Sequence, residues 1–392
     1  MTGNERFAAV DARSHHALFS DEHEQLRAEV RLFVEKELLP HAPRWEKEEA
    51  FPREVFERLG ELGLLGLKFS PRFGGEDDVV ADAVVTEELA RCGSGGVAAA
   101  IGAHKDLAAL YLARFGTEDQ QERWLRPSVE GRLIGGLALT EPDAGSDLAA
   151  LRTSARRDGD DWILSGTKTF VTNGAWADFL IVGANTGSSS RDRDLTLFVL
   201  DPGAVGVSRR RIRMLGWRPS QTGEVHLDSV RIPDSHRLGE EGSGFYAIMR
   251  SLGWERLVMA LGAVSGASLT YDIAKKYALA RTAFGRPVAK FQVWRHRFAE
   301  MASKIEAARA LTYSALRLVA EGEEAREQVA MAKLYSSRVA LDVADECVQI
   351  HGGYGYVTEF SAERALRDAR LGPIGGGTSE IMKEIIGRGL GI

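Results

Sequence analysis

The order of hydrophobic patterns along the chain limits its fold most, because the pattern changes twice. In the first third, Leu26, Val30, Phe33 and Val34 recur at helical spacing after a predicted cap at Ser20. Residues 134–232 contain short β-branched or aromatic runs separated by Gly, Asp, Asn and Ser, which predicts a small antiparallel barrel or sandwich. After about residue 242, long stretches rich in Ala, Leu and Val predict helices that approach closely. The predicted fold class is therefore α+β.

This pattern predicts three domains: an N-terminal α-helical domain (1–133), a middle β domain (134–240) and a C-terminal four-helix bundle (241–392). Helices are expected over 56–65, 82–92, 97–115, 119–125, 245–277, 291–321, 325–349 and 381–388. Strands are expected over 161–165, 169–172, 179–182, 196–200 and 225–232. Because no strand is followed by G-x-G-x-x-G, a doubly wound dinucleotide-binding fold is disfavoured.

Composition narrows the function class. A chain with 44% hydrophobic and 27% charged residues is globular, and a net charge of −6 argues against a nucleic-acid partner. The two cysteines, Cys92 and Cys347, are too few for a disulfide framework, and the scattered histidines predict no metal site. The polar N-terminus and the lack of an apolar run of about 18 residues predict no secretion and no membrane insertion. With its excess of Arg, Ala and Gly, the chain is expected to be bacterial and cytoplasmic.

Three loops combine glycine with short polar side chains: LALTEPDAGSD (137–147), GTKTFVTNG (166–174) and PIGGGTSE (373–380). The first exposes backbone N–H groups that suit a planar ring or a phosphate, although an ordinary strand and turn explains it as well. In the second, Phe170 and Thr172 share one face of a strand and could line a flat ligand or simply pack there. The third precedes a helix, so it is either an anion site or a glycine linker.

Three further signals have plain structural explanations. QIHGGYGY (349–356) ends a long helix and reads as a helix C-cap. The basic run at 208–214 is expected to be a solvated strand or loop. His104 is expected to be a hydrogen-bonded helix histidine.

Glu255 is the residue with the clearest chemical potential. Its helical neighbours, Ser251, Leu252, Val258 and Met259, form a largely apolar face. A carboxylate on such a face is poorly solvated, which raises its pKa toward that of a general base working near neutral pH. The alternative is a Glu paired with a buried Arg from across the bundle.

Six segments in order resemble the acyl-CoA dehydrogenase family over nearly the whole chain. They are ALTEPDAGSD (138–147), TFVTNG (169–174), GWRPSQTGEVHLDSVRIP (216–233), RTAFGRPVAKFQ (281–292), QIHGGYGY (349–356) and GGGTSEIMKEIIGR (375–388). The resemblance implies helical, β and four-helix-bundle domains, FAD between the β domain and the bundle, and a homotetramer built as a dimer of dimers. It also implies α,β-desaturation of an acyl thioester, with an electron-transferring flavoprotein as acceptor.

By residue-wise matching, the resemblance implies that one subunit lines the flavin ring, with the Thr172 hydroxyl near flavin N5. The pyrophosphate and adenosine would be met by Thr378 to Glu380 of one subunit, with further contacts from its neighbour. The residues that contact the flavin ring would be Leu137, Leu139, Thr140, Gly145, Ser146, Phe170, Val171 and Thr172. The residues near the pyrophosphate would include Thr378, Ser379 and Glu380. The neighbour would supply Arg281, Phe284, Gln292, Gln349, Ile350, His351, Gly352 and Gly353. Leu137 and Phe170 stand where relatives often have Tyr and Trp.

The base is the main departure from the common family pattern. Many relatives carry a base Glu where this chain has Gly376, whereas a subset resembling isovaleryl- and long-chain enzymes carries it in a bundle-helix pattern L-x-x-E-R. Leu252, Glu255 and Arg256 fit that pattern, so Glu255 is the expected catalytic base. The acyl-pantetheine would contact Ser146, Tyr246, Gly253, Arg256, Gly376 and Gly377, although Gly253 replaces a frequent Asp.

The expected function is thus that of an FAD-dependent acyl-CoA dehydrogenase in fatty or branched-chain acyl metabolism. Three alternatives stay open: a dehydrogenase acting on a carrier-protein thioester, a flavin oxidase or monooxygenase, and a non-catalytic scaffold that binds flavin. The sequence leaves the acyl chain length open.

Overall fold

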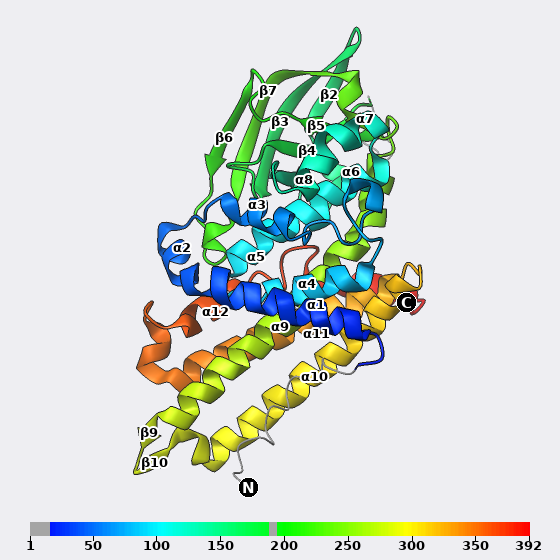
Figure 1. The fold of residues 1–392 in the computed structure, drawn as a ribbon. Helices are drawn as coiled ribbons and strands as arrows, with labels where there is room; N and C mark the ends of the chain where they lie inside the picture. Colours follow the sequence, from blue (N-terminus) through cyan, green and yellow to red (C-terminus); the bar gives the residue numbers. More distant parts are fainter. Residues whose placement is uncertain (1–15, 188–193) are drawn as a thin grey trace.

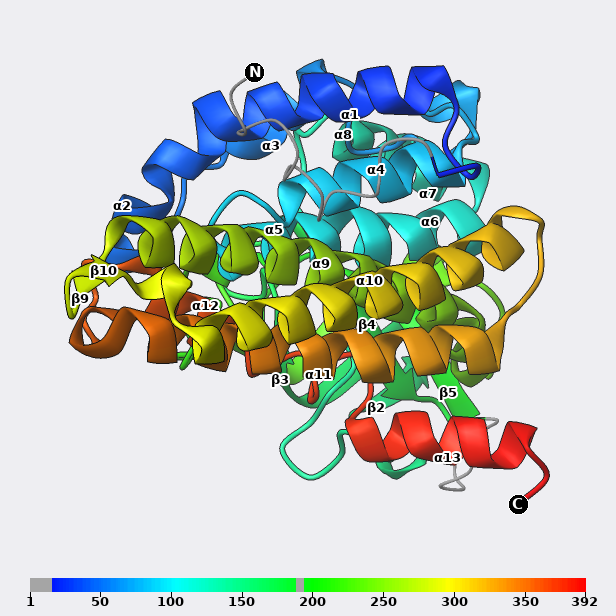
Figure 2. The same cartoon turned by 90° about the horizontal axis from the view of Figure 1, so that it is seen from below.

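The computed structural model describes residues 16–187 and 194–392, and it confirms the predicted α+β fold (Figure 1). The sheet lies at one end of the molecule, the long C-terminal helices at the other, and the N-terminal helices pack against both. Figure 2 shows the three longest helices side by side.

Short helices form the N-terminal part. They are α1 (Asp21–Phe33), α2 (Ala42–Glu48), α3 (Glu54–Glu61), α4 (Val79–Leu89), α5 (Gly95–Gly102), α6 (Ala109–Phe115), α7 (Glu118–Gln120) and α8 (Arg126–Val129). Ser20 caps α1 in a capping box with His23, as its position before the apolar repeat predicts. The helix expected over 97–115 is interrupted by a π-helical turn, η4 (Ala103–Ala108), between α5 and α6.

The middle part is a twisted sheet. Its strands are β1 (Gly135–Ala138), β2 (Ser154–Asp158), β3 (Asp161–Val171), β4 (Phe179–Asn185), β5 (Leu195–Leu200), β6 (Val207–Arg211), β7 (Gly223–Pro233) and β8 (Arg237–Leu238). The strand order is β6-β7-β3-β2-β4-β5-β8, and β1 pairs with β4. Most pairs are antiparallel, whereas β4 pairs in parallel with β1 and β2. The runs expected at 161–165 and 169–172 belong mainly to one strand, β3, whose pairing with β7 shifts register near Gly166.

Long helices form the C-terminal part. They are α9 (Gly244–Ala280), α10 (Gln292–Ala320) and α11 (Arg326–His351), followed by the shorter α12 (Ser361–Ala369) and α13 (Ser379–Gly389). The short strands β9 (Thr282–Ala283) and β10 (Arg286–Pro287) join α9 to α10. No helix was predicted at α12, although Ala362, Ala365, Leu366 and Ala369 recur at helical spacing along these nine residues.

The central helix α9 is long and apolar enough to cross a membrane, judged by length and composition alone. Its most apolar 18-residue window has a mean hydropathy of 1.4, and 56% of that window is buried inside the protein. Such burial is typical of the core helix of a bundle, which must be hydrophobic on most of its surface.

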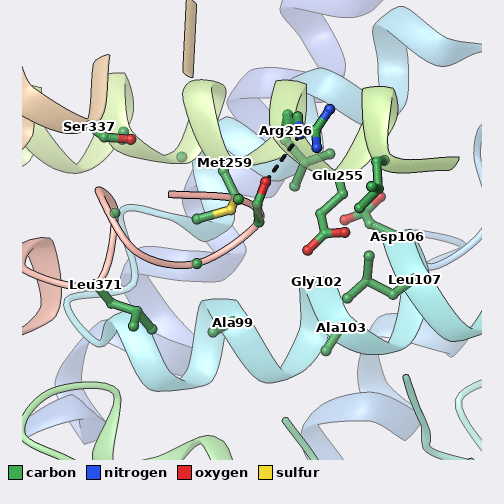
Figure 3. A pocket seen from close by; sticks show the side chains of 18 of the residues that line it. Ala99, Gly102, Ala103, Asp106, Leu107, Glu255, Arg256, Met259, Ser337 and Leu371 are labelled. Carbon is green, nitrogen blue, oxygen red and sulfur yellow. Dashed lines mark hydrogen bonds between the residues drawn. The ribbon is translucent and has the colours of Figure 1, made fainter. Parts of the chain in front are cut away.

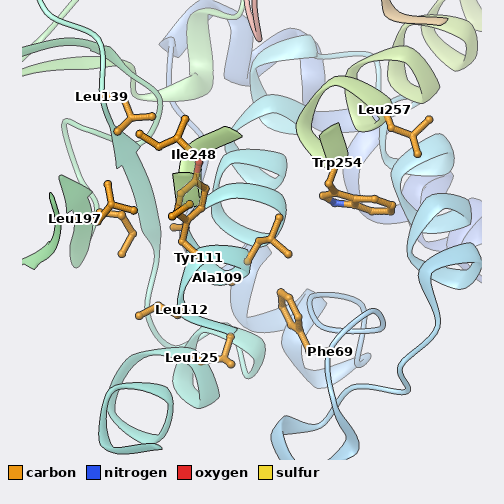
Figure 4. Packing of buried hydrophobic residues seen from close by; sticks show 14 of the residues in the cluster. Phe69, Ala109, Tyr111, Leu112, Leu125, Leu139, Leu197, Ile248, Trp254 and Leu257 are labelled. Carbon is orange, nitrogen blue, oxygen red and sulfur yellow. The ribbon is translucent and has the colours of Figure 1, made fainter. Parts of the chain in front are cut away.

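One hydrophobic cluster joins the three parts (Figure 4). It contains Tyr111 from α6, Leu197 from β5, and Ile248, Trp254 and Leu257 from α9. Because these side chains come from all three parts, the space between the sheet and the bundle has a fixed shape.

Two structural explanations from the sequence are confirmed. His104 is fully buried, faces the Ser128 carbonyl through Nε2 at 3.0 Å and accepts from the Gly135 N–H through Nδ1 at 3.1 Å. Arg209 and Arg210 of the basic run lie exposed on β6.

Replacing Leu257 by Ala should lower the free energy of unfolding by about 2–5 kcal/mol, because a fully buried side chain is lost from the shared cluster. Leu32→Ala is the control, since Leu32 is half exposed on α1 and should change stability by about 0.5 kcal/mol or less. Urea unfolding of the flavin-loaded protein measures both; equal losses would contradict the role given to the cluster.

Candidate active site

A cavity of about 2080 Å³ lies between the sheet, the helices α5, η4 and α9, and the loop before α13. Single-ligand pockets usually occupy about 300–1,000 Å³, so this cavity has room for two ligands. The cavity brings together thirteen of the predicted site residues: Leu137, Leu139, Thr140, Gly145, Ser146, Phe170, Thr172, Gly253, Glu255, Arg256, Gly376, Gly377 and Thr378.

The other predicted site residues lie outside this cavity lining. Val171 is buried in the sheet core, Ser379 and Glu380 form the first turn of α13, and Tyr246 is 74% exposed near the start of α9. The residues predicted to serve a neighbouring subunit lie around the far ends of α9, α10 and α11 (Figure 1), and they are Arg281, Phe284, Gln292, Gln349, Ile350, His351, Gly352 and Gly353.

A buried ion pair fixes the loop at 140–147. The Glu141 carboxylate accepts from the Lys168 ammonium at 2.7 Å and from the backbone N–H groups of Arg152 and Thr153 at 2.7 and 2.9 Å. The Lys168 ammonium also donates to the carbonyl of Leu139 at 3.0 Å. Lys168 is fully buried, so the strand end and the loop are held as one unit.

Asn173 holds the end of β3 against the helical domain. Its amide nitrogen donates to the carbonyls of Ala100 at 2.8 Å and Gly135 at 3.1 Å. The two preceding cavity residues, Phe170 and Thr172, are fixed by this anchor. Phe170 has a φ of +56° and is 61% exposed, so its ring stands out from the sheet toward the cavity.

Glu255 lines the cavity from α9 (Figure 3). Burial raises the pKa of its carboxyl, while the positive charges of Arg256 and Lys333 partly oppose that shift. No hydrogen bond or ion pair joins Glu255 to another residue within 16–187 and 194–392. The alternative of a structural Glu locked to an Arg is therefore wrong for the described chain.

The glycine loop lies next to this carboxylate. Gly376 and Gly377 have φ values of +60° and +99°, which favour glycine, and a Cβ on Gly376 would lie 3.6 Å from Glu255 Oε1. The Arg256 Nε donates to the Gly376 carbonyl at 3.1 Å, and the Lys333 ammonium donates to the Gly377 carbonyl at 2.5 Å. Backbone N–H groups of both glycines donate to no acceptor among the described residues.

Two residues that contact the glycine loop were not predicted as site residues from the sequence. Lys333 is fully buried on α11, and burial together with the nearby Arg256 charge lowers its pKa to about 8. A lone Lys among Val329, Ala330 and Ser337 was the available signal. Met259 was noted only as an apolar neighbour, yet its Sδ lies 2.4 Å from the position a Cβ on Gly376 would take.

The cavity fits a flavin dinucleotide on the structure's own evidence. One wall offers the Phe170 ring and the hydroxyls of Thr140 and Thr172, which suits a flat ring with polar edges. At the other end of the cavity, the Thr378 hydroxyl caps α13 by accepting a hydrogen bond from the Ile381 N–H at 3.3 Å. The glycine loop therefore leads into the N-terminus of a helix, which favours negatively charged groups such as phosphates.

Comparisons with known proteins agree with this geometry. The chain matches the family models for the N-terminal, middle and C-terminal domains of acyl-CoA dehydrogenases over residues 20–132, 136–230 and 242–391. It is 40% identical to the mitochondrial long-chain specific acyl-CoA dehydrogenase of Sus scrofa, over 95% of this chain and 87% of that protein.

Solved structures are similarly close. An acyl-CoA dehydrogenase from Geobacillus kaustophilus superposes with a TM-score of 0.92 at 38% identity, covering 95% of this chain and 99% of that one. A chain in a structure described as the electron transferring flavoprotein of Acidaminococcus fermentans also gives 0.92, at 36% identity and 95% and 98% coverage. The chain therefore belongs to the acyl-CoA dehydrogenase family, and it is an FAD-dependent oxidoreductase that desaturates acyl-CoA thioesters.

Proposed function

We propose that Glu255 is the base that removes the α-proton of the acyl thioester. The observation that carries this proposal is a cavity-lining carboxylate whose pKa is raised by burial and which no described residue neutralises directly. A general base is most effective when its pKa approaches the working pH. Bound FAD supplies the acceptor for the hydride that leaves the β-carbon.

The glycine loop is proposed to stabilise the charge that develops on the thioester oxygen. The free N–H of Gly376 lies in the same loop as the carbonyls held by Arg256 and Lys333. Those two bonds fix the 376–377 and 377–378 peptide planes, which follow directly after the plane that carries the Gly376 N–H. A donor held in place before the substrate arrives stabilises an enolate without reorganisation. Ser146, Tyr246, Gly253, Arg256 and Gly377 complete the proposed acyl-pantetheine contacts.

The flavin is proposed to lie along the cavity wall formed by 137–146 and 170–172, with Thr378, Ser379 and Glu380 toward the pyrophosphate. The remaining predicted contacts lie far from this cavity at the end of the bundle, so we assign them to a neighbouring subunit in a homotetramer. Phe284 supports this assignment, because its ring is 96% exposed and suited to contact with another molecule.

An electron-transferring flavoprotein is the proposed acceptor of the reducing equivalents. The similarity to a chain in the Acidaminococcus fermentans structure supports this partner. A cytoplasmic location in a bacterial cell is likewise proposed, on composition.

Glu255→Gln should leave the protein yellow but slow anaerobic flavin bleaching by an acyl-CoA by about 10²–10⁴-fold, because the proton acceptor is lost. Glu323→Gln is the matched control, since Glu323 is an exposed carboxylate at the same cavity. Stopped-flow absorbance measures both variants. A Glu255→Gln enzyme as fast as the wild type would refute the assignment.

The same variant should become more stable relative to the wild type as pH rises. The folded pKa of Glu255 is raised, so the folded state binds the proton more tightly than the unfolded state, and wild-type stability falls as pH rises through that window. We expect the difference in melting temperature between Glu255→Gln and wild type to be larger at pH 7 than near pH 4.5. A difference independent of pH would contradict the burial of this carboxylate.

Gly376→Ala should destabilise the protein by about 1–3 kcal/mol, because alanine is strained at a φ of +60° and its methyl would meet Met259. Combining it with Met259→Ala should cost less than the sum of the single changes, since the steric part disappears. Thermal unfolding of the four flavin-loaded proteins tests this coupling. Strict additivity would show that Met259 does not limit the side chain at this position.

A further inference from the structure

A buried ammonium group lies behind the glycine loop. Lys333 on α11 is fully buried and lies outside the cavity lining. Its ammonium donates to the Gly377 carbonyl at 2.5 Å, the single acceptor that residues 16–187 and 194–392 offer it. An ammonium has three N–H donors, and burying a charge with so few partners is unfavourable. The stability of the fold therefore does not explain why a charge stands at this position.

Three charged groups act on this ammonium. Arg256 on α9 lowers the pKa of Lys333, whereas Glu255 on α9 and Glu380 on α13 raise it. The helices α10 and α12 also pack against α11, but within the described chain they supply no charge that shifts this pKa. Burial has the largest effect, and the resulting pKa is about 8. Lys333 is therefore charged at neutral pH and loses its proton in mildly alkaline solution.

Lys333 and Arg256 hold neighbouring peptide units of the glycine loop. Arg256 Nε donates to the Gly376 carbonyl at 3.1 Å (Figure 3), and Lys333 donates to the next carbonyl, that of Gly377. Both glycines have positive φ values, and glycine restricts its own backbone least of all residues. The two bonds therefore supply a rigidity that the loop sequence lacks. A charged donor makes a hydrogen bond roughly twice as strong as a neutral one, so the Lys333 bond weakens when its proton is lost.

The proposed reaction moves negative charge from Glu255 toward this loop. Glu255 takes the α-proton and becomes neutral, and the electron pair of the broken C–H bond is delocalised onto the thioester oxygen. The charges of Arg256 and Lys333 already act on Glu255, and both side chains also hold the loop that is proposed to meet that oxygen. Fixed cations between the two places compensate the negative charge at the start and at the end of the transfer. Loss of the Lys333 charge removes part of this compensation.

We propose that the charged form of Lys333 is a positioning residue for removal of the α-proton, and that loss of its own proton sets the alkaline limit of the enzyme. The inference rests on the proposed roles of Glu255 and the glycine loop. Because Lys333 lies outside the cavity lining, it acts through the Gly377 carbonyl. The rate of flavin bleaching should rise with pH as Glu255 loses its proton and fall again as Lys333 loses its proton.

Lys168 is a second candidate source of an alkaline limit. It is also fully buried, and burial lowers its pKa to about 8. Its ammonium holds the Glu141 carboxylate and the Leu139 carbonyl on the sheet side of the cavity. Arginine variants distinguish the two lysines, because a guanidinium keeps its charge throughout the alkaline range.

The pH profile of anaerobic flavin bleaching tests the proposal with the flavin-loaded protein, at saturating acyl-CoA between pH 6 and 10. The wild-type rate should fall about tenfold or more above pH 8. Lys333→Met should be about ten- to a hundredfold slower than the wild type at pH 7 and should lack the alkaline fall, because the loop is no longer held in place. Lys333→Arg should move the fall beyond pH 10, whereas Lys168→Arg should leave it near pH 8. Lys304→Met is the control, since Lys304 is half exposed on α10 and its loss should not change the profile.

Thermal unfolding separates positioning from a merely structural role. The folded pKa of Lys333 is lowered, so the unfolded state binds this proton more tightly than the folded state. Wild-type stability relative to Lys333→Met should therefore rise as pH increases above 8, while the wild-type rate falls over the same interval. Calorimetry with a 2-enoyl-CoA product should give affinities within about threefold of each other for the two proteins, because Lys333 lies behind the loop.

The outcomes are distinct from those for the proposed function. A wild-type rate that stays constant from pH 8 to 10 overturns the inference about Lys333 and leaves the dehydrogenase in place. The inference is also wrong if Lys168→Arg moves the alkaline fall, and that result decides the question even where the Lys333 variants do not fold. If rate and relative stability fall together above pH 8, the role of Lys333 is structural only. If no acyl-CoA bleaches the flavin at any pH, the proposed function fails and this inference fails with it.

Discussion

A half-buried carboxylate without a direct counter-ion is the constraint on which this site depends. An ion pair would neutralise Glu255, and bulk water would return its pKa to an ordinary value. The structure avoids both. The charges of Arg256 and Lys333 are close enough to oppose the rise that burial causes in the pKa of Glu255. Their N–H groups, however, donate hydrogen bonds to the carbonyls of Gly376 and Gly377 and not to the Glu255 carboxylate. The same two cations thus leave the proposed base free and hold the loop opposite it.

The position of the base and the glycine loop are linked through packing. Met259 occupies the space beside Gly376, one helical turn after Glu255 on α9. A side chain on the loop would meet this sulfur and would also be strained by the positive φ. The helix therefore carries the carboxylate, and the loop contributes backbone groups only. This division explains why a glycine at 376 and a glutamate at 255 belong together.

Much of the fold was predictable because its signals are local. Helical periodicity around Val30 and Phe33, alternating short runs in the middle and Ala-rich helices at the end each reflect burial of one face. The weaker predictions depended on tertiary contacts. The sequence of the helix expected over 97–115 does not mark the π-helical turn η4. The helix α12 is only nine residues long and was missed although its small and apolar residues recur at helical spacing. Lys333 was missed because a charge within a helix reveals its role only through what lies opposite.

The sequence by itself determined the three-part order, the loops that carry short polar side chains, and a glutamate on an apolar helical face. These properties follow from spacing along one element, which sets the face that a side chain occupies. Only the tertiary structure decided that Glu255 has no ion partner among the described residues, that Lys333 reaches Gly377, and that Trp254 donates to the buried Asp106. Each of these depends on atoms far apart in the chain, whose distances are set by packing of the helices and the sheet rather than by local pattern.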